Sequence, residues 1–361
     1  MKKIIFVTLT LGNAGAERVS SLLINNWAQK GYEIEVIQTQ SDDTSLNYDM
    51  TDKISYKFVK SKIHFMPLRR IDEAVKVSKI LKQNPDAIGM AFVRRSILTL
   101  ALAAFFSGNR IIVSERNDPR SVPKGRIAKS IRNMIFKNAN ACVFQTQEAM
   151  DYFPEKARKK GYIISNPINP DLPQINSGER KKRIIAVCRL SPQKNLEMLI
   201  RAFGSIAHLY PEYTLEIFGE GPERDKLQEL IEKLNMERQI ILKGFSRTIY
   251  DEMNNSKMYV SSSNYEGISN SMLEALAMGL PSVVTDCPAG GARMVIKNGI
   301  NGILVPVNNQ EQMSRALSEL LGDEDGLKRI SLEARKIREE YSIDEIGNQW
   351  IKVIDKVLNG D

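Results

Sequence analysis

Two glutamates eight residues apart, Glu266 and Glu274, stand out because core packing does not require them at that spacing. They lie in the stretch NYEGISNSMLEALAMGLP, where a polar turn opens an apolar helix. That turn consists of Gly267, Ile268, Ser269 and Asn270. Ser269 or Asn270 would cap the helix, whose first N–H groups would hold a phosphate. A carboxylate accepts two hydroxyl groups at once, so Glu274 suits a diol such as a ribose and Glu266 suits a sugar beyond the phosphates. Taken alone, the motif is explained equally well by a structural role, in which Glu274 is a cap partner and Glu266 belongs to an exposed loop.

Cations and glycines follow other apolar runs of the chain. Arg189 and Lys194 stand in CRLSPQKN, directly after the run RIIAVC. Two cations about five residues apart in a strand-to-helix turn can close on a diphosphate from two sides, whereas a single cation is usually surface charge. Glycines that allow close backbone approach occur at two similar turns, namely Gly12 and Gly15 in TLGNAGAER and Gly219 and Gly221 in FGEGPERDKL. The first pair matches neither a dinucleotide fingerprint nor a Walker loop, and a plain tight turn explains it equally well.

These turns separate segments that alternate between strand-like and helix-like patterns, which predicts parallel sheets covered by helices on both faces. The predicted strands are KIIFVTLTL, YEIEVIQT, AIGMAF, RIIVSE and ACVFQT in the first half and RIIAVCRL, YTLEIFG, QIILKGF, KMYVSSS and PSVVTD in the second. Ligands of such sheets bind at the carboxyl ends of the strands. Every turn that follows a strand is therefore a candidate site.

The length and the linker predict how the chain divides. At 361 residues it is too long for one ordinary core, and a proline-rich stretch without periodicity spans 164–183. We expect α/β architecture with two doubly wound Rossmann-like domains, over 1–167 and 168–340, that face each other across a cleft. A last helix over 341–361 should pack back towards the N-terminal domain.

Charge is unevenly distributed along the chain. The net charge is +8, but residues 1–165 carry +12 and residues 166–361 carry −4. This excess of positive charge indicates that the first half binds an anionic partner, such as a membrane surface, a phosphate-bearing substrate or a nucleic acid. The alternative is a basic surface that serves only solubility. Three widely spaced cysteines indicate neither a disulfide framework nor a zinc site, so a cytoplasmic location is expected. The longest apolar run apart from the first strand, ILTLALAAFF, is too short to span a membrane.

A set of motifs in order gives the chain a family resemblance. YEGISNSMLEALAMGLP resembles the E-x7-E motif of the family-4 retaining glycosyltransferases, which have the GT-B fold. The supporting motifs GNAGAER, CRLSPQKN, FGEGP, LKGF and NGINGILVP occur in the family's order. The resemblance implies a nucleotide-sugar donor, most often a UDP-sugar, that is bound mainly by the second domain. It places Arg189 and Lys194 on the diphosphate, with Gly15 near the phosphates, Glu274 on the ribose and Glu266 on the donor sugar. It also implies retention of configuration without a cofactor or an obligatory metal ion.

One position departs from the family pattern. Many relatives carry a histidine where Arg116 stands in SERNDP, so the role of Arg116, in the donor site or the acceptor site, is open. Glu115, Arg116 and Asn117 are acceptor-side candidates. The SERNDP form resembles that of glycan-assembly members, whose acceptors are often polyprenyl-diphosphate lipids. KSKIHFMPLRR (60–70) mixes cations with apolar residues, as a loop touching an anionic membrane would. We therefore expect a peripheral enzyme of bacterial surface polysaccharide assembly at the inner face of the cytoplasmic membrane.

Two other functions are compatible with parts of the pattern. A nucleotide-sugar 2-epimerase shares the two-domain architecture, but it should present acid/base carboxylates or histidines that the sequence does not show. A non-catalytic basic protein could bind nucleic acid through its first half, but the aromatic interleaving of a single-strand binder is missing.

Overall fold

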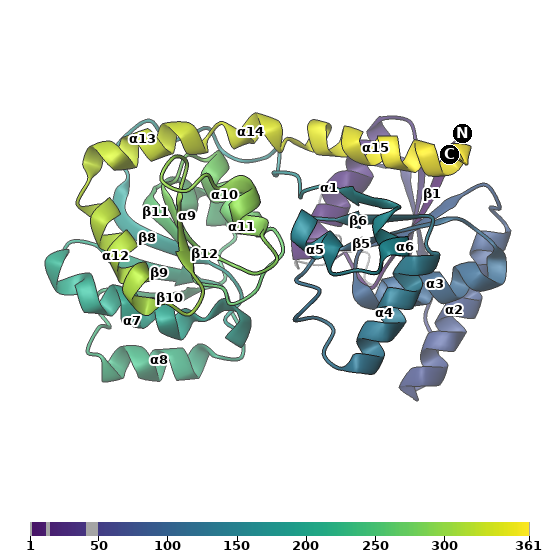
Figure 1. Ribbon diagram of the computed structural model, residues 1–361, viewed down its shortest axis with the longest axis horizontal. Coiled ribbons are helices and arrows are strands. Elements are labelled where there is room, and N and C mark those ends of the chain that lie inside the picture. Colours follow the sequence, from purple (N-terminus) through teal and green to yellow (C-terminus); the bar gives the residue numbers. More distant parts are fainter. Residues whose placement is uncertain (1, 12–14, 41–49, 361) are drawn as a thin grey trace. The chain divides into compact units, whose positions relative to one another are not determined.

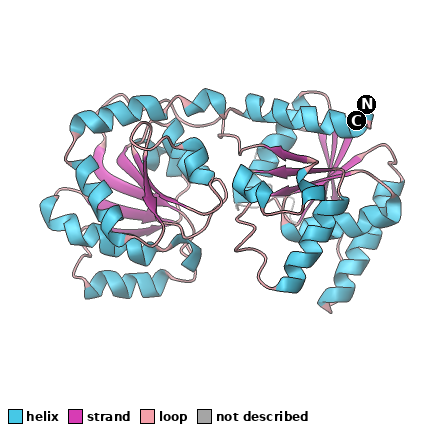
Figure 2. Ribbon diagram, viewed as in Figure 1, coloured by secondary structure: helices cyan, strands magenta, loops and turns pink. Residues whose placement is uncertain are grey.

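The computed structural model describes residues 2–11, 15–40 and 50–360, which form two compact units (Figure 1). Unit 1 comprises Met1–Pro167 together with Ser342–Asp361, and unit 2 comprises Ile168–Tyr341. Gly12, one of the glycines singled out in the sequence, lies outside the described residues. Within each unit, helices cover a central sheet (Figure 2).

Unit 1 contains a parallel sheet of seven strands in the order β3-β2-β1-β4-β5-β6-β7. The strands are β1 (Lys3–Thr8), β2 (Glu33–Gln38), β3 (Ile54–Phe58), β4 (Ile88–Ala91), β5 (Ile111–Glu115), β6 (Ala141–Phe144) and β7 (Gly161–Ile163). The helices are α1 (Gly15–Gln29), α2 (Met66–Lys82), α3 (Arg94–Ser107), α4 (Arg126–Asn138), α5 (Gln147–Asp151), α6 (Glu155–Arg158) and α15 (Ile343–Asn359). The inner strands are buried on both faces, as their apolar runs predict.

The last helix, α15, belongs to unit 1 although the chain reaches it only after unit 2. Its Trp350 is fully buried and packs against Trp27 of α1 and Phe92 after β4, with ring centroids 5.8 Å and 4.9 Å apart. Asp344 accepts a hydrogen bond from Asn26 at 3.0 Å. Both apolar and polar contacts therefore fix this helix on the first unit.

Unit 2 contains a parallel sheet of six strands in the order β10-β9-β8-β11-β12-β13. The strands are β8 (Lys181–Val187), β9 (Thr214–Phe218), β10 (Ile240–Gly244), β11 (Ser256–Ser261), β12 (Ser282–Asp286) and β13 (Ile303–Pro306). The helices are α7 (Leu196–Ile206), α8 (Arg224–Lys233), α9 (Ile249–Asn254), α10 (Asn270–Ala277), α11 (Gly291–Val295), α12 (Gln310–Leu321), α13 (Glu324–Ala334) and α14 (Ile337–Glu340), with 3-10 turns at Pro192–Lys194 and Ala207–Leu209. The two doubly wound parallel sheets confirm the predicted α/β fold class.

Strand order in each unit marks where a ligand should bind. In unit 1 the chain builds outward from β1 to β3 and then returns to the other side of β1 with β4. Unit 2 reverses in the same way between β8 and β11. Because the loops that leave these neighbouring strands diverge, the carboxyl ends of β1 and β4, and of β8 and β11, are the expected binding positions.

Candidate active site

The loops after β8 and β11 are joined by an ion pair between Lys194 and Glu266. Their Nζ and Oε2 atoms lie 2.5 Å apart, and the side chains are only 15% and 22% exposed. Ser263 also donates to Glu266 Oε2, at 3.1 Å. Burial alone would lower the pKa of Lys194, but the carboxylate of Glu266 outweighs it and holds that pKa above its ordinary value. Lys194 is therefore a cation fixed at the switch point of unit 2.

Backbone contacts hold the same two loops in place. Asn264 N donates to Gln193 O and Ser262 Oγ donates to Lys194 O, both at 2.8 Å. Asn195, in the left-handed conformation at φ 46°, donates from Nδ2 to Asn264 Oδ1 at 2.9 Å. The position of Lys194 is thus set by the backbone of the neighbouring loop as well as by its own charge partner.

Arg189 lies in the first of these loops and is exposed. Within the part of the chain that the structure describes, it has no ion-pair partner. Gly219 and Gly221 support its loop, because a Cβ atom at these positions would lie 2.0 Å from Cys188 O and 2.1 Å from Leu190 O. The close approach predicted for these glycines is therefore made to the protein backbone on both sides of Arg189.

The predicted helix start is present at α10. Ser269 is the N-cap and accepts a hydrogen bond from Met272 N, so Asn270 is the first helical residue. Glu266, Gly267 and Ser269 line a common small cavity after β11, and Ile268 beside them is buried. The turn therefore places Glu266 and the amino end of α10 next to each other.

Glu274 lies one turn into α10 and is only 4% exposed. The hydroxyl group of Tyr250, on α9, donates to its Oε1 atom at 3.3 Å. Both glutamates of the sequence motif thus carry defined polar partners in unit 2.

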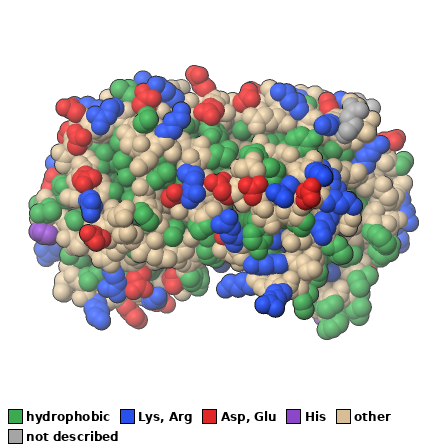
Figure 3. Space-filling view, viewed as in Figure 1, with side chains coloured by type: hydrophobic (Ala, Val, Ile, Leu, Met, Phe, Trp, Pro, Cys, Tyr) green, Lys and Arg blue, Asp and Glu red, His purple; other side chains and the backbone are tan. Residues whose placement is uncertain are grey.

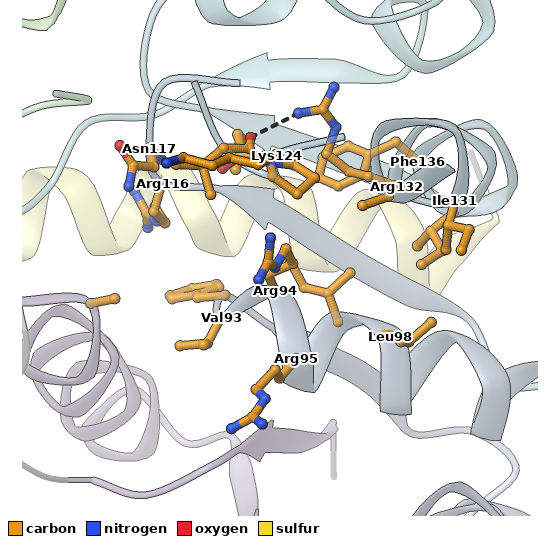
Figure 4. Close-up of a pocket in the computed structure, with 18 of the residues that line it drawn as sticks. Val93, Arg94, Arg95, Leu98, Arg116, Asn117, Lys124, Ile131, Arg132 and Phe136 are labelled. Carbon is orange, nitrogen blue, oxygen red and sulfur yellow. Dashed lines mark hydrogen bonds between the residues drawn. The ribbon is translucent and has the colours of Figure 1, made fainter. Parts of the chain in front are cut away.

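A large cavity of unit 1 lies at the carboxyl ends of β4 and β5 and has a volume of about 730 Å³ (Figure 4). Glu115, Arg116 and Asn117, the predicted acceptor-side residues, all line it. Its other charged residues were not predicted from the sequence and are Arg70, Arg94, Arg95, Lys124 and Arg132. They come from α2, α3, α4 and the loop before α4, so they share no local motif that could have indicated them. Gly15 opens α1, and its neighbour Ala16 lines the cavity.

Positive charge in this cavity is largely uncompensated. Arg70, Arg94, Arg95 and Lys124 form no ion pair within residues 2–11, 15–40 and 50–360. Figure 4 shows Arg94 and Arg95 on α3, with Lys124 and Arg132 across the pocket from them. Such an arrangement attracts an anion, because each bound negative charge relieves repulsion between the cations.

Among the described residues, Glu115 is the single carboxyl group that lines the cavity. Burial raises its pKa to about 7, although Arg132 and the N–H groups of Asn117 and Arg116 oppose the shift. Its Oε1 atom accepts from Asn117 N at 3.2 Å. The charge of the cavity therefore changes by one near neutral pH.

Arg116 is held by aromatic rings. Its Cζ atom lies 4.7 Å from the ring centroid of Phe92 and 5.3 Å from that of Trp350. Its Nη1 atom donates to Asn166 Oδ1 at 3.1 Å, whereas Nε and Nη2 are buried and find no hydrogen-bond partner among the residues that the structure describes. Burial lowers the pKa of Arg116 to about 9. The guanidinium group lines the cavity but is largely engaged by its own unit, and this leaves its predicted catalytic role a prediction.

The described residues contain no cluster of three or more His, Cys, Asp or Glu side chains that could hold a metal ion. Among these residues no helix combines the length and the apolar character that crossing a membrane requires.

Replacing Glu115 with Gln should make pyrophosphate binding to the cavity less sensitive to pH. The wild-type carboxyl group is neutral below pH 7 and charged above it, so its charge opposes the anion at pH 8 but not at pH 6. Calorimetry at both pH values should show affinity falling roughly tenfold more in wild type than in E115Q. The charge of pyrophosphate itself changes with pH, but this affects wild type and E115Q equally and cancels in the comparison. E155Q, at an exposed carboxylate of unit 1, is the control. Equal pH dependence of wild type and E115Q would contradict the assignment.

Comparison with known proteins gives the family. The model described as Glycosyl transferases group 1 matches residues 168–337, almost all of unit 2. The chain is 27% identical to the N-acetylgalactosamine-N,N'-diacetylbacillosaminyl-diphospho-undecaprenol 4-alpha-N-acetylgalactosaminyltransferase of Campylobacter jejuni, over 90% of this chain and 91% of that one. It is 28% identical to the poly(glycerol-phosphate) alpha-glucosyltransferase of Bacillus subtilis over 65% of this chain, and this match spans 35% of that longer relative.

A solved structure shows the same fold. Anabaena HepE, in complex with UDP and glucose, matches with a TM-score of 0.85 at 17% sequence identity and covers 99% of this chain and 100% of HepE. The GT-B prediction is thereby confirmed. The transferase is favoured over the epimerase and the non-catalytic protein by the family match and the transferases among the relatives, since the epimerase shares the fold. The match to glycosyl transferases group 1 lies within unit 2, and relatives such as the Campylobacter enzyme, which align over most of the chain, are glycosyltransferases, so this chain is a glycosyltransferase of the same kind.

Proposed function

We propose that this glycosyltransferase moves a sugar, with retention of configuration, from a UDP-sugar to a glycan acceptor carried on polyprenyl diphosphate. The reaction would serve bacterial surface polysaccharide assembly at the inner face of the cytoplasmic membrane. The observation that carries the proposal is the shielded pair of Lys194 and Glu266 beside the capped start of α10. It combines a fixed cation for phosphate with a carboxylate for sugar hydroxyl groups.

Unit 2 would bind the donor. The N–H groups at the start of α10, the exposed guanidinium of Arg189 and the ammonium of Lys194 would surround the diphosphate. Glu266 would accept hydrogen bonds from the transferred sugar, and Glu274 would accept those of the ribose. Lys194 has three donor hydrogens, so it can keep its bond to Glu266 while it contacts a phosphate oxygen.

The cations would also do the work of a metal ion. As the sugar leaves, negative charge grows on the diphosphate, and positive groups fixed in advance stabilise that charge. We therefore propose that no obligatory metal ion or cofactor takes part. The family's retaining route, in which the donor phosphate itself takes the proton of the acceptor, needs no protein nucleophile.

Unit 1 would bind the acceptor. Its cavity offers four cations that form no ion pair with the described part of the chain, which suit a diphosphate, and apolar side chains at Ile97, Leu98, Ile131 and Ile135. The Campylobacter relative, by its name, acts on an acceptor linked through diphosphate to undecaprenol. A charged cavity with apolar walls supports the same class of acceptor for this chain.

Exposed apolar stripes on two helices of unit 1 support membrane contact. On α2, Leu68, Ile71 and Val75 are spaced like a buried helix face but are 53%, 50% and 38% exposed. On α4, Ile127 and Met134 are 78% and 55% exposed. Phe65, just before α2, is 66% exposed, and Figure 3 shows hydrophobic side chains gathered at this end of unit 1 with Lys and Arg nearby. Such patches mark interaction sites, and cations among apolar residues fit an anionic bilayer.

Replacing Lys194 with Ala should lower turnover with a UDP-sugar donor at least tenfold, which corresponds to about 1.4 kcal/mol of barrier. The loss follows because a cation that stabilises the leaving diphosphate acts mainly in the transition state. The measurement is steady-state transfer to a polyprenyl-diphosphate acceptor, with EDTA present and absent, and EDTA should not abolish activity.

Lys182 provides a matched control, since it lies at the amino end of β8, the strand that precedes the loop of Lys194, and pairs with Glu212 on the surface. K182A should transfer sugar at the wild-type rate. A loss below tenfold in K194A would make that cation peripheral, and a complete, metal-reversible loss in EDTA would argue against cation-assisted departure.

The full chain should bind vesicles that contain phosphatidylglycerol, weakly and less well as salt rises, because the electrostatic part is screened. Replacing Phe65 and Leu68 together with Ser should weaken cosedimentation several-fold, since apolar burial is lost. L332S, at an exposed leucine of unit 2, should bind like wild type. Equal binding to neutral phosphatidylcholine vesicles at every salt concentration would exclude the electrostatic contribution.

A further inference from the structure

A short hydrogen-bond relay reaches the buried carboxylate of Glu274 from the first residues of unit 2. Asn169 Nδ2 donates to the hydroxyl oxygen of Tyr250 at 3.1 Å. That hydroxyl group donates in turn to Glu274 Oε1 at 3.3 Å. The three residues lie in the segment before β8, in α9 and in α10, so the relay connects separate parts of the unit.

The direction of the relay is set by its outer end. Asn169 Oδ1 accepts from the backbone N–H of Asp171 at 3.2 Å, which leaves the amide nitrogen to face Tyr250. An amide nitrogen can only donate, so the hydroxyl oxygen is the acceptor there and its proton points to Glu274. Hydrogen bonds aligned in this way polarise and strengthen one another.

The helix that carries Tyr250 is itself anchored. Arg183, only 4% exposed, pairs through Nη1 with Glu252 Oε2 at 2.6 Å, and its Nη2 atom donates to Glu252 O. Arg183 Nε donates to Ser256 Oγ at 2.8 Å. These bonds fix the short α9 to the sheet, and Tyr250 therefore reaches Glu274 from a rigid support.

We propose that Tyr250 is a positioning residue for nucleoside recognition, and that it acts through Glu274. Its hydroxyl group holds one carboxylate oxygen and thereby sets the plane in which Glu274 meets the two ribose hydroxyl groups. A carboxylate that can rotate bonds two adjacent hydroxyl groups less well, because its orientation must be fixed when the ligand binds. The proposal rests on the donor site proposed above and adds Tyr250, oriented by Asn169, to it.

The test compares two nucleotides that differ only at the ribose. Calorimetry would measure the affinity of the full chain for UDP and for 2′,3′-dideoxy-UDP. Wild type should prefer UDP roughly tenfold or more, since the analogue cannot donate the two ribose hydrogen bonds to the buried carboxylate of Glu274. Tyr250→Phe should cut that preference several-fold while leaving the affinity for the dideoxy analogue nearly unchanged. If the role of the hydroxyl group is purely structural, Tyr250→Phe should lower the affinity for both nucleotides by the same factor.

Two further variants make the result specific. Tyr210→Phe removes a hydroxyl group that donates to Ser318 O at 2.7 Å elsewhere in unit 2, and it should keep the wild-type preference. Asn169→Ala leaves Tyr250 intact and should lower the preference by a smaller factor in the same direction. Thermal unfolding would confirm that all variants are folded.

The outcomes separate this inference from the proposed function. An unchanged UDP preference in Y250F overturns the positioning role while leaving the donor site standing. If wild type binds UDP and its dideoxy analogue with equal affinity, Glu274 does not recognise the ribose and Tyr250 does not position it. Wild type that binds no UDP overturns the donor assignment and the inference together.

Discussion

The ion pair of Lys194 and Glu266 is the contact on which the proposed donor site depends. It joins the carboxyl ends of β8 and β11, the neighbours at which the strand order of unit 2 reverses. Removing two charges from water is costly, and such a pair contributes little net stability. Its value is chemical, because the carboxylate of Glu266 keeps Lys194 cationic at a site where a phosphate and a sugar would meet.

The two units handle charge in opposite ways. In unit 2 the buried cation is matched by a carboxylate, and the adjacent loops are held by backbone hydrogen bonds. In unit 1 four cations of one cavity have no ion-pair partner among the described residues. The one carboxyl group that these residues contribute to its lining, that of Glu115, has a pKa raised by burial to about 7. A balanced site suits a ligand with both hydroxyl groups and phosphates, whereas an unbalanced site suits one that brings its own negative charge.

The sequence predicts features that depend on neighbouring residues, but not those that depend on contacts between residues far apart in the chain. Strands such as β5 and β8 were predictable because burial on both faces gives apolar runs, but β3 was missed because only its first residue is buried. The N-cap at Ser269 is local and was predicted as one of two choices. The pairing of Lys194 with Glu266 spans 72 residues, and the cations of unit 1 come from several helices, so no local spacing reveals either. The glycines Gly219 and Gly221 were recognised, but their partner, the backbone around Arg189, was not.

The central claim is that Arg189 and Lys194 of unit 2 bind the second phosphate of the donor nucleotide, the phosphate that UDP has and UMP lacks. The most direct measurement is the ratio of the affinities for UDP and UMP, determined by calorimetry for wild type and for a chain in which Arg189 and Lys194 are both replaced with Gln. The account predicts that wild type binds UDP at least tenfold more tightly than UMP and that the ratio falls towards one in the double variant. An equal ratio in the two proteins would contradict it.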